Sequence, residues 1–216
     1  MCQKQQAHCV FEYIYFARLD SKIDGVSVYE SRLKAGEALA KVYPAEADMV
    51  AGVPDSGITA AQGVCQSLRY SLWNGFLQKQ LCGKNLYQTY TGGAGIQCAS
   101  ETQRAGAGSQ RKEPCLVDDS IVRGTTIANL IRLLKQAGAG KVHVRISSPP
   151  FLYPCYYGTD VPSNKQLLAV SHSTEEIRRM IGADSLGYMK VEDLAAMAEG
   201  LPLCKACFDN RYPTEI

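Results

Sequence analysis

One segment constrains the fold of this 216-residue chain more than any other: Cys115-Leu-Val-Asp-Asp-Ser-Ile-Val-Arg-Gly-Thr-Thr126. An apolar run leads into two adjacent acids, a short Ser/Arg/Gly/Thr loop follows, and a helical pattern comes next. A parallel strand delivers carboxylates and an anion-binding loop in this order to the carboxyl edge of a sheet, where α/β proteins bind ligands. Adjacent acids can also belong only to a helix N-cap region, but the flanking strand and amphipathic helix favour a ligand site.

The residue types in this segment suit a sugar phosphate. Asp118 and Asp119 can bind paired sugar hydroxyls or a Mg²⁺-bound sugar. The loop from Ser120 to Thr126 offers backbone N–H groups, hydroxyls and a helix N-terminus to an anion. The segment therefore predicts a ribose 5-phosphate site.

Strand and helix patterns alternate along most of the chain. We expect strands at 9–16, 49–53, 115–118 and 142–147, and helices at 31–42, 174–181 and 191–198. A further helix is expected after the acid pair, with Ile127, Leu130, Ile131 and Leu134 on one face and Gly138 as its stop. This order predicts an α/β fold with a parallel sheet flanked by helices, in one domain over 9–216 after a disordered start at 1–8. Residues 64–114 show no sustained periodicity, so we expect this stretch to be irregular.

Composition limits the class of partner. The net charge is +2 and 20% of residues are charged, which indicates no nucleic-acid binding, and no apolar run is long enough for a membrane span. The start lacks a secretory signal, so we expect a cytoplasmic location. Nine cysteines in a reducing compartment favour metal ligands, catalytic groups or small core residues over disulfides. Taken alone, the pair Cys204-Lys-Ala-Cys207 leaves zinc, a redox pair and chance open.

Several further segments carry a resemblance to a known family. They are Cys9-Val-Phe-Glu-Tyr-Ile-Tyr-Phe-Ala-Arg-Leu-Asp-Ser21, Val53-Pro-Asp-Ser-Gly57, Leu116–Thr126, Val142-His-Val-Arg-Ile-Ser-Ser-Pro-Pro150, Ser171–Arg178, Ile181-Gly-Ala-Asp184 and Cys204-Lys-Ala-Cys-Phe208. Together they resemble the phosphoribosyltransferase half of the amidophosphoribosyltransferases, over residues ~9–63 and ~115–216. The resemblance implies a fold like that of the type I phosphoribosyltransferases.

The resemblance also implies an activity and its site. The family displaces pyrophosphate from phosphoribosyl pyrophosphate (PRPP) with ammonia and forms 5-phosphoribosylamine, the first step of de novo purine (IMP) biosynthesis. By this resemblance, Asp118 and Asp119 hold the ribose hydroxyls and Mg²⁺, and Ser56 joins the metal and pyrophosphate site. The 5-phosphate cradle comprises Ser120, Arg123, Gly124, Thr125 and Thr126. Purine nucleotides as inhibitors and a homo-oligomer are implied in the same way.

Many family members also carry a 4Fe-4S cluster held by four cysteines. The matching positions in this chain are Cys9, Cys155, Cys204 and Cys207. Cysteine thiolates are the usual ligands of such clusters. The resemblance therefore implies a structural cluster that joins the N-terminal segment to the C-terminal one.

Two departures from the family bear on activity. The glutaminase half, which precedes this domain in the family and uses an N-terminal cysteine, is missing. We therefore interpret Met1 as an internal or fragment start, and the position of Cys2 as a coincidental match to that cysteine. Residues ~64–114 do not match either. One frame away, a plausible coding sequence for the family's Gly-Ile-Pro-Tyr-Gly-Met-Gly-Phe reads as the segment from Arg69 to Phe76. Our hypothesis is a pair of compensating frame errors.

This departure falls on the loop that, in the family, closes over PRPP. The family's basic Lys-Asn-Arg-Tyr-x-Gly-Arg corresponds here to Gln78-Lys-Gln-Leu-Cys-Gly-Lys84. We therefore expect weak or absent turnover. Three alternatives remain: a PRPP- or nucleotide-binding regulatory domain without catalysis, an interaction module built on the CxxC pair, and a phosphoribosyltransferase that uses a nucleobase.

Overall fold

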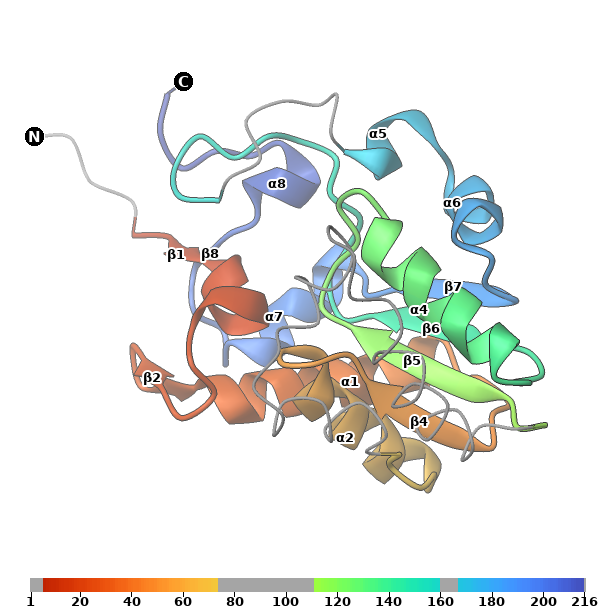
Figure 1. Cartoon of the computed structure of the whole chain (residues 1–216). Helices are drawn as coiled ribbons and strands as arrows, with labels where there is room; N and C mark the ends of the chain where they lie inside the picture. Colours follow the sequence, from red (N-terminus) through yellow and green to blue (C-terminus); the bar gives the residue numbers. More distant parts are fainter. Residues whose placement is uncertain (1–5, 74–110, 160–166, 216) are drawn as a thin grey trace, which may run out of the picture.

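The computed structural model describes residues 6–73, 111–159 and 167–215, and its centre is a four-stranded parallel sheet (Figure 1). The strand order is β4-β5-β6-β7, with β4 at Met49–Gly52, β5 at Pro114–Asp118, β6 at His143–Ile146 and β7 at Ser185–Tyr188. All neighbouring strands pair in parallel, so their carboxyl ends lie along one edge. The predicted α/β fold is confirmed.

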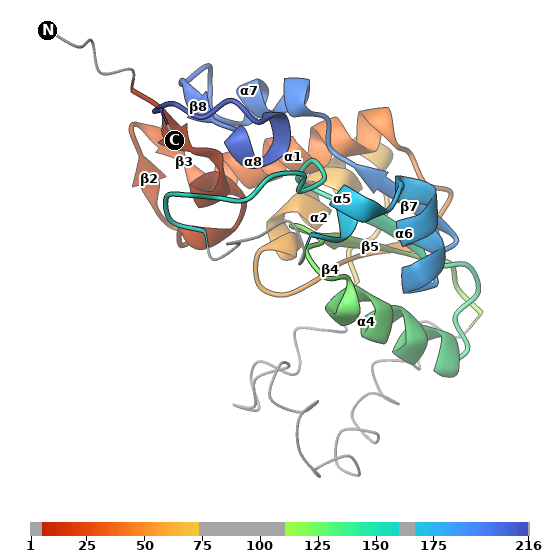
Figure 2. The ribbon, with the colours of Figure 1, turned by 90° about the horizontal axis from the view of Figure 1, so that it is seen from above.

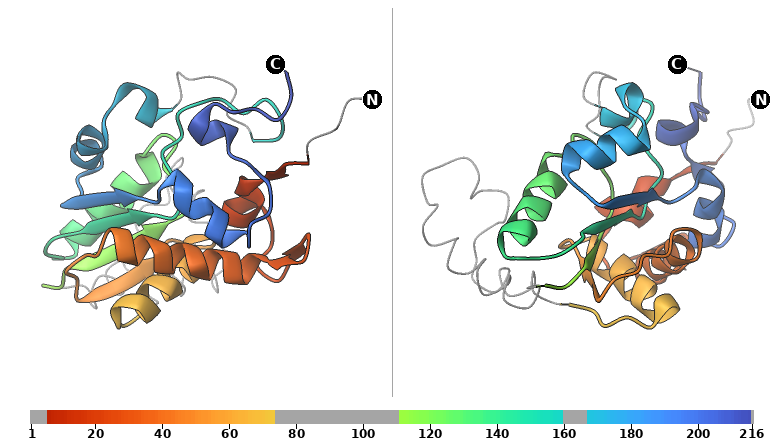
Figure 3. Two further views of the ribbon diagram at one scale, coloured as in Figure 1. Left: turned by 180° about the vertical axis from the view of Figure 1, so that it is seen from behind. Right: turned by 90° about the vertical axis from the view of Figure 1, so that its right-hand side faces the viewer.

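Helices cover both faces of the sheet (Figure 3). One face carries α1 (Val28–Val42) and α2 (Gly57–Leu68), and the other carries α4 (Thr125–Gln136) and α6 (Thr174–Ile181). Side chains of β5 alternate between the two layers, with Leu116 toward α4 and Val117 toward α1 and α2. This alternation follows from the two-residue period of a strand.

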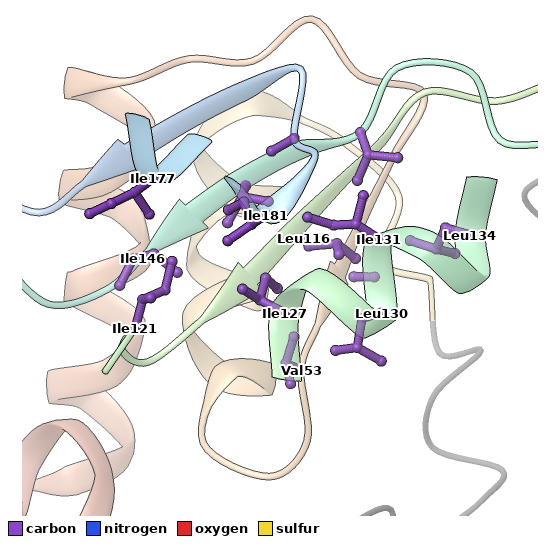
Figure 4. Close-up of a cluster of buried hydrophobic side chains, with 14 of the residues drawn as sticks. Val53, Leu116, Ile121, Ile127, Leu130, Ile131, Leu134, Ile146, Ile177 and Ile181 are labelled. Atoms are coloured by element: carbon purple, nitrogen blue, oxygen red, sulfur yellow. The ribbon is translucent and has the colours of Figure 1, made fainter. Parts of the chain in front are cut away.

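The layer between the sheet and α4 is built from branched aliphatic side chains (Figure 4). The expected apolar face of α4 is buried there: Ile127, Leu130, Ile131 and Leu134. Helix α6 begins with the expected capping box, in which Ser173 accepts a bond from the Glu176 amide and the Glu176 side chain accepts one from the Ser173 amide. Local sequence signals therefore position both helices.

The two ends of the described chain form a third cluster beside the sheet (Figure 2). Strand β1 (His8–Cys9) pairs in parallel with β8 (Leu203–Cys204), and the hairpin of β2 (Lys22–Ile23) and β3 (Val26–Ser27) lies before α1. The remaining short helices are α5 (Leu168–Ser171), η5 (Val191–Asp193), α7 (Leu194–Met197) and α8 (Ala206–Asp209). The expected helix at 191–198 is confirmed as η5 and α7. His8, expected in the disordered start, lies in β1, and residues 1–5 fall outside the described residues.

The strand expected over 9–16 is wrong beyond Cys9. Residues 10–16 are helical and include a π-helical turn, η1 (Glu12–Phe16). The helical turn places Phe11 and Phe16 edge to face, with ring centroids 5.5 Å apart, and buries Tyr13 and Ile14. Phe11 also packs against Phe151, with ring centroids 5.0 Å apart, so tertiary contacts of this helical segment override its strand propensity.

The irregular stretch expected over 64–114 is also wrong at both ends. Helix α2 continues to Leu68, and β5 begins at Pro114. Between them, Leu72 forms a parallel bridge with Val50, and the Trp73 amide donates to the Val50 carbonyl at 2.7 Å. The small residues of α2 pack closely on α1 and conceal a helical pattern. Residues 74–110, including most of the suspected frame-shifted segment and the loop at 78–84, lie outside the described residues. No helix within the described ranges is long and apolar enough to cross a membrane.

Candidate functional site

A pocket of about 470 Å³ lies at the carboxyl end of β5. Its lining includes every residue from Asp118 to Ile127, together with Phe11, Tyr15, Phe16 and Thr159. The seven residues that the sequence assigns to PRPP therefore line one pocket. Strand β5 ends on Asp118 and Asp119 follows it directly, while the loop and the first turn of α4 supply the remainder.

The two acids are buried at the base of this site. Asp118 and Asp119 are each 8% exposed, and the Asp119 amide donates to Oδ1 of Asp118 at 2.9 Å. Burial raises the pKa of Asp118 well above its usual value, and the charge of Asp119 raises it further. Burial also raises the pKa of Asp119, against the opposing effect of its hydrogen-bond donors. A cation or sugar hydroxyls at this point would stabilise the ionised pair.

Ser56 lies beside the acid pair, as the sequence analysis expected. It stands at the N-cap of α2, but its hydroxyl donates to Oδ2 of Asp119 and caps no backbone amide. The close approach depends on Gly57, because a Cβ at that position would lie 2.4 Å from the carbonyl oxygen of Val117. Ser120 donates to Oδ1 of Asp119 at 2.5 Å from the opposite side. Two loops thus position one carboxylate.

The cradle expected for the phosphate is a helix N-terminus. Gly124 is the N-cap of α4 with φ of 74°, a left-handed conformation that glycine adopts without strain. No side chain caps the first turn, in which Thr125 and Thr126 lie, and both threonines line the pocket. Unpaired amides and the helix dipole at such an end favour an anion.

Two parts of the site were not predicted from the sequence. One is an aromatic wall from η1, where Tyr15 is 50% exposed and Phe16 is 43% exposed. The other is Arg32 on α1, which is buried and lies close enough to Asp119 to lower the pKa of that carboxyl. The segment was predicted to be a strand, in which adjacent side chains point to opposite faces, so exposure of both aromatic residues could not be inferred. The charge of Arg32 gives no sequence signal of burial.

The residues present fit a magnesium ion. Mg²⁺ is usually bound by one or two carboxylates together with substrate phosphates and water, so two acids suffice. Burial raises the pKa of both carboxyls, and a cation bound between them would favour their ionised forms. Asp118 and Asp119 would hold the ion, with the Ser56 hydroxyl adjacent to Asp119.

The structure places the four predicted cluster cysteines in one region. Cys9 is the direct neighbour of Cys204 in the β1–β8 pair. The carbonyl of Cys207 accepts bonds from the amides of Leu152 and Tyr153, at 3.0 and 3.1 Å, which brings it beside the loop that carries Cys155. Burial raises the pKa of the Cys207 thiol, and the negative charges of the other three cysteines raise it further.

Backbone amides in this region are directed at sulfur. The Thr159 amide donates to Sγ of Cys155 at 3.4 Å, and bonds of this kind lower the pKa of that thiol despite its partial burial. Amide bonds to thiolates are a common feature around Fe–S clusters. Among the described residues, no group of three or more His, Cys, Asp or Glu side chains is arranged to hold a single metal ion.

The parallel sheet, the acid pair at its carboxyl edge and the loop-to-helix cradle together define a phosphoribosyltransferase-like domain. No family model matches the sequence. Relatives do: amidophosphoribosyltransferase of Archaeoglobus fulgidus is 41% identical over 217 residues, covering 99% of this chain and 48% of its own length. The Bacillus subtilis enzyme is 41% identical, covering 96% of this chain and 45% of its own length.

Solved structures agree. Glutamine PRPP amidotransferase from Bacillus subtilis, complexed with ADP and GMP, matches with a TM-score of 0.81 and 40% identity over 97% of this chain and 47% of that one. The chain is thus an amidophosphoribosyltransferase homologue that corresponds to the phosphoribosyltransferase portion. It spans about half the length of the curated relatives that it matches.

Proposed function

We propose that this chain binds PRPP at the pocket beyond β5 and transfers its phosphoribosyl group to ammonia, giving 5-phosphoribosylamine in purine biosynthesis. The observation that supports this most is the joint lining of one pocket by the acid pair and the uncapped start of α4. Such a pocket can bind the two ends of a ribose 5-phosphate at once, with hydroxyls on carboxylates and phosphate on amides.

The chemistry needs positioning more than a nucleophilic side chain. The bond from C1 to pyrophosphate breaks, a bond from C1 to the ammonia nitrogen forms, and the nitrogen then loses a proton. Asp118 and Asp119 would orient the ribose through its hydroxyls, while Thr125 and Thr126 fix the 5-phosphate. Mg²⁺, when bound, would neutralise the leaving pyrophosphate. Fixed dipoles around a sugar centre that becomes positive lower the barrier.

Pyrophosphate release with PRPP, Mg²⁺ and ammonium chloride tests this function. We expect slow release that rises with ammonia concentration, because the loop sequence at 78–84 departs from the basic pattern. Asp119→Asn should abolish the release, while Asp184→Asn, which removes an acid paired with Lys135 away from the pocket, should not. Fast turnover would contradict the expected low activity.

Direct binding separates the enzyme from the regulatory alternative. PRPP binding in calorimetry without ammonia-dependent release would favour a PRPP- or nucleotide-binding regulatory domain, for which the ADP and GMP bound to the related structure are a precedent. Absence of both binding and release would reject the proposed function. A homo-oligomer, inhibition by purine nucleotides and a cytoplasmic location remain proposals, and one relative, from Glycine max, is named as chloroplastic.

The 4Fe-4S cluster belongs to the same proposal. Cys9, Cys155, Cys204 and Cys207 would supply four thiolates, and their shared region and amide donors support that assignment. The frame hypothesis for 64–114 is tested by the genomic DNA over these codons and their flanks. If no shifted frame over these codons restores a family-like segment, the frame hypothesis is rejected.

A further inference from the structure

Arg32 makes an unusual set of contacts behind the pocket wall. Its side chain leaves α1, the residue is 6% exposed, and its guanidinium donates to three backbone carbonyls. Nε donates to the Tyr13 carbonyl at 3.0 Å, and Nη2 donates to the carbonyls of Tyr15 and Ala17 at 3.0 and 2.8 Å. All three acceptors lie within or just after η1.

These carbonyls need a partner from outside their own segment. The last carbonyls of any helix lack intrahelical donors, and η1 is only one short turn. A planar guanidinium carries five N–H donors in a fixed fork, so one side chain can bond several carbonyls spread along a turn. A lysine ammonium is a compact point charge on a flexible stem and does not reproduce that spread.

The segment that Arg32 holds is also a wall of the pocket. Tyr15 and Phe16 line it together with the acids and the start of α4. Arg32 further lies close enough to Asp119 for their charges to attract. One buried cation thus contacts the backbone of the aromatic wall and influences the acid pair.

We propose that Arg32 is a positioning residue whose guanidinium holds the Tyr13–Ala17 backbone, and so sets where the aromatic wall stands against a bound sugar phosphate. The inference rests on the proposed function, because it concerns the same pocket. Arg32 does not line the pocket and acts through the wall, so it is no catalytic residue.

Three variants test the role. Arg32→Ala removes the donors, Arg32→Lys keeps the charge but not the fork, and Lys34→Ala is the control, since Lys34 lies on the same helix and bonds only Glu199 in the contacts described for it. Calorimetry measures the affinity for ribose 5-phosphate. Hydrogen exchange by mass spectrometry measures the protection of residues 13–17, where the Ala17 amide donates to the Glu12 carbonyl at 3.1 Å.

We expect both Arg32 variants to bind ribose 5-phosphate more weakly by on the order of tenfold, with faster exchange over 13–17 and no change in Lys34→Ala. Millimolar guanidinium should restore the affinity of Arg32→Ala for ribose 5-phosphate, and methylammonium should not. A general loss of packing would not produce this difference between the two cations. If Arg32→Ala fails to fold, Arg32→Lys carries the comparison.

Two results would overturn the inference: unchanged exchange over 13–17 in a folded Arg32 variant, or faster exchange with unchanged affinity. If the unmodified chain binds no ribose 5-phosphate and no PRPP, the proposed function fails. Hydrogen exchange over residues 13–17 then decides alone whether Arg32 holds this segment. Failure of the positioning role and failure of the proposed function can therefore be distinguished.

Discussion

At the residue scale, the buried acid pair lowers the stability of the fold while it lines the proposed binding pocket. Burial and the charge of Asp119 raise the pKa of Asp118, so ionising this carboxyl in the folded state costs stability. Stability is therefore fullest in acid and is lost as the pH rises through the raised pKa. We predict that Asp118→Asn stabilises the chain at about pH 8, and that this gain vanishes only as the pH falls below the ordinary carboxyl pKa of about 3.9. Urea unfolding at several pH values measures it.

Asp184 provides a control of opposite sign. Its pKa is lowered in spite of partial burial, because the Lys135 ammonium and the Val142 amide donate to its carboxylate. Its contribution to stability is present at neutral pH and is lost as the pH falls. Asp184→Asn should therefore destabilise at about pH 8 and become neutral in acid. If both variants changed the free energy of unfolding in the same direction at about pH 8, burial of the acid pair would not be the cause of the lost stability.

Residue types predicted the centre of the site but not its surroundings. Asp118, Asp119 and Ser56 follow apolar strands, and polar groups in that position meet at one edge of a parallel sheet. Arg32 lies on a helix that also bears exposed charges, so nothing local distinguishes a buried cation from a solvated one. Its role depends on η1 crossing α1, which is a tertiary contact.

At the element scale, the packing of α1 on α2 depends on two glycines. A Cβ on Gly63 would lie 2.1 Å from the Leu33 carbonyl oxygen, and one on Gly36 would lie 1.9 Å from the Ala60 carbonyl oxygen. We predict that Gly63→Ala destabilises the chain by about 2–3 kcal/mol, because the helices must separate, although alanine has the higher helix propensity. Gly158→Ala, which meets nothing within 4 Å, should leave urea unfolding unchanged. Equal stability of the two variants would contradict close packing at this crossing.

Elements with strong periodicity were predictable, and those decided by tertiary contacts were not. The apolar spacing of α4 and the capping box of α6 are read directly from the chain. Strand β7 (Ser185–Tyr188) gave no expectation, because four residues at a sheet edge are too short for a clear alternation. Helix α2 was missed because its buried face consists of Gly, Ala and Thr apart from Val64, and these small side chains carry little hydrophobic contrast.

At the scale of the whole molecule, the N-terminal and C-terminal segments of the described chain pack against each other. Strands β1 and β8 pair over two residues only, which is marginal by itself. The aromatic cluster of Phe11, Phe151 and Phe208 adds apolar contact, with neighbouring ring centroids 5.0 and 5.2 Å apart. The four cysteines lie at this same junction, so a cluster there would tie together segments that are distant in sequence.

This placement predicts how cluster binding affects stability. Anaerobic reconstitution with iron and sulfide should produce the broad visible absorption of an Fe–S cluster and raise Tm by about 5 °C or more, because a group that binds only the folded state stabilises it. Cys207→Ser should lose both effects, since Cys207 is influenced by the other three cysteines. Cys65→Ser should keep both, because Cys65 lies on α2, in the cluster formed by α1, α2 and the sheet. If Cys207→Ser retained the absorption and the rise in Tm, the four-cysteine assignment would be rejected. If the unmodified chain took up iron and sulfide without a rise in Tm, the cluster would not be what joins β1 to β8.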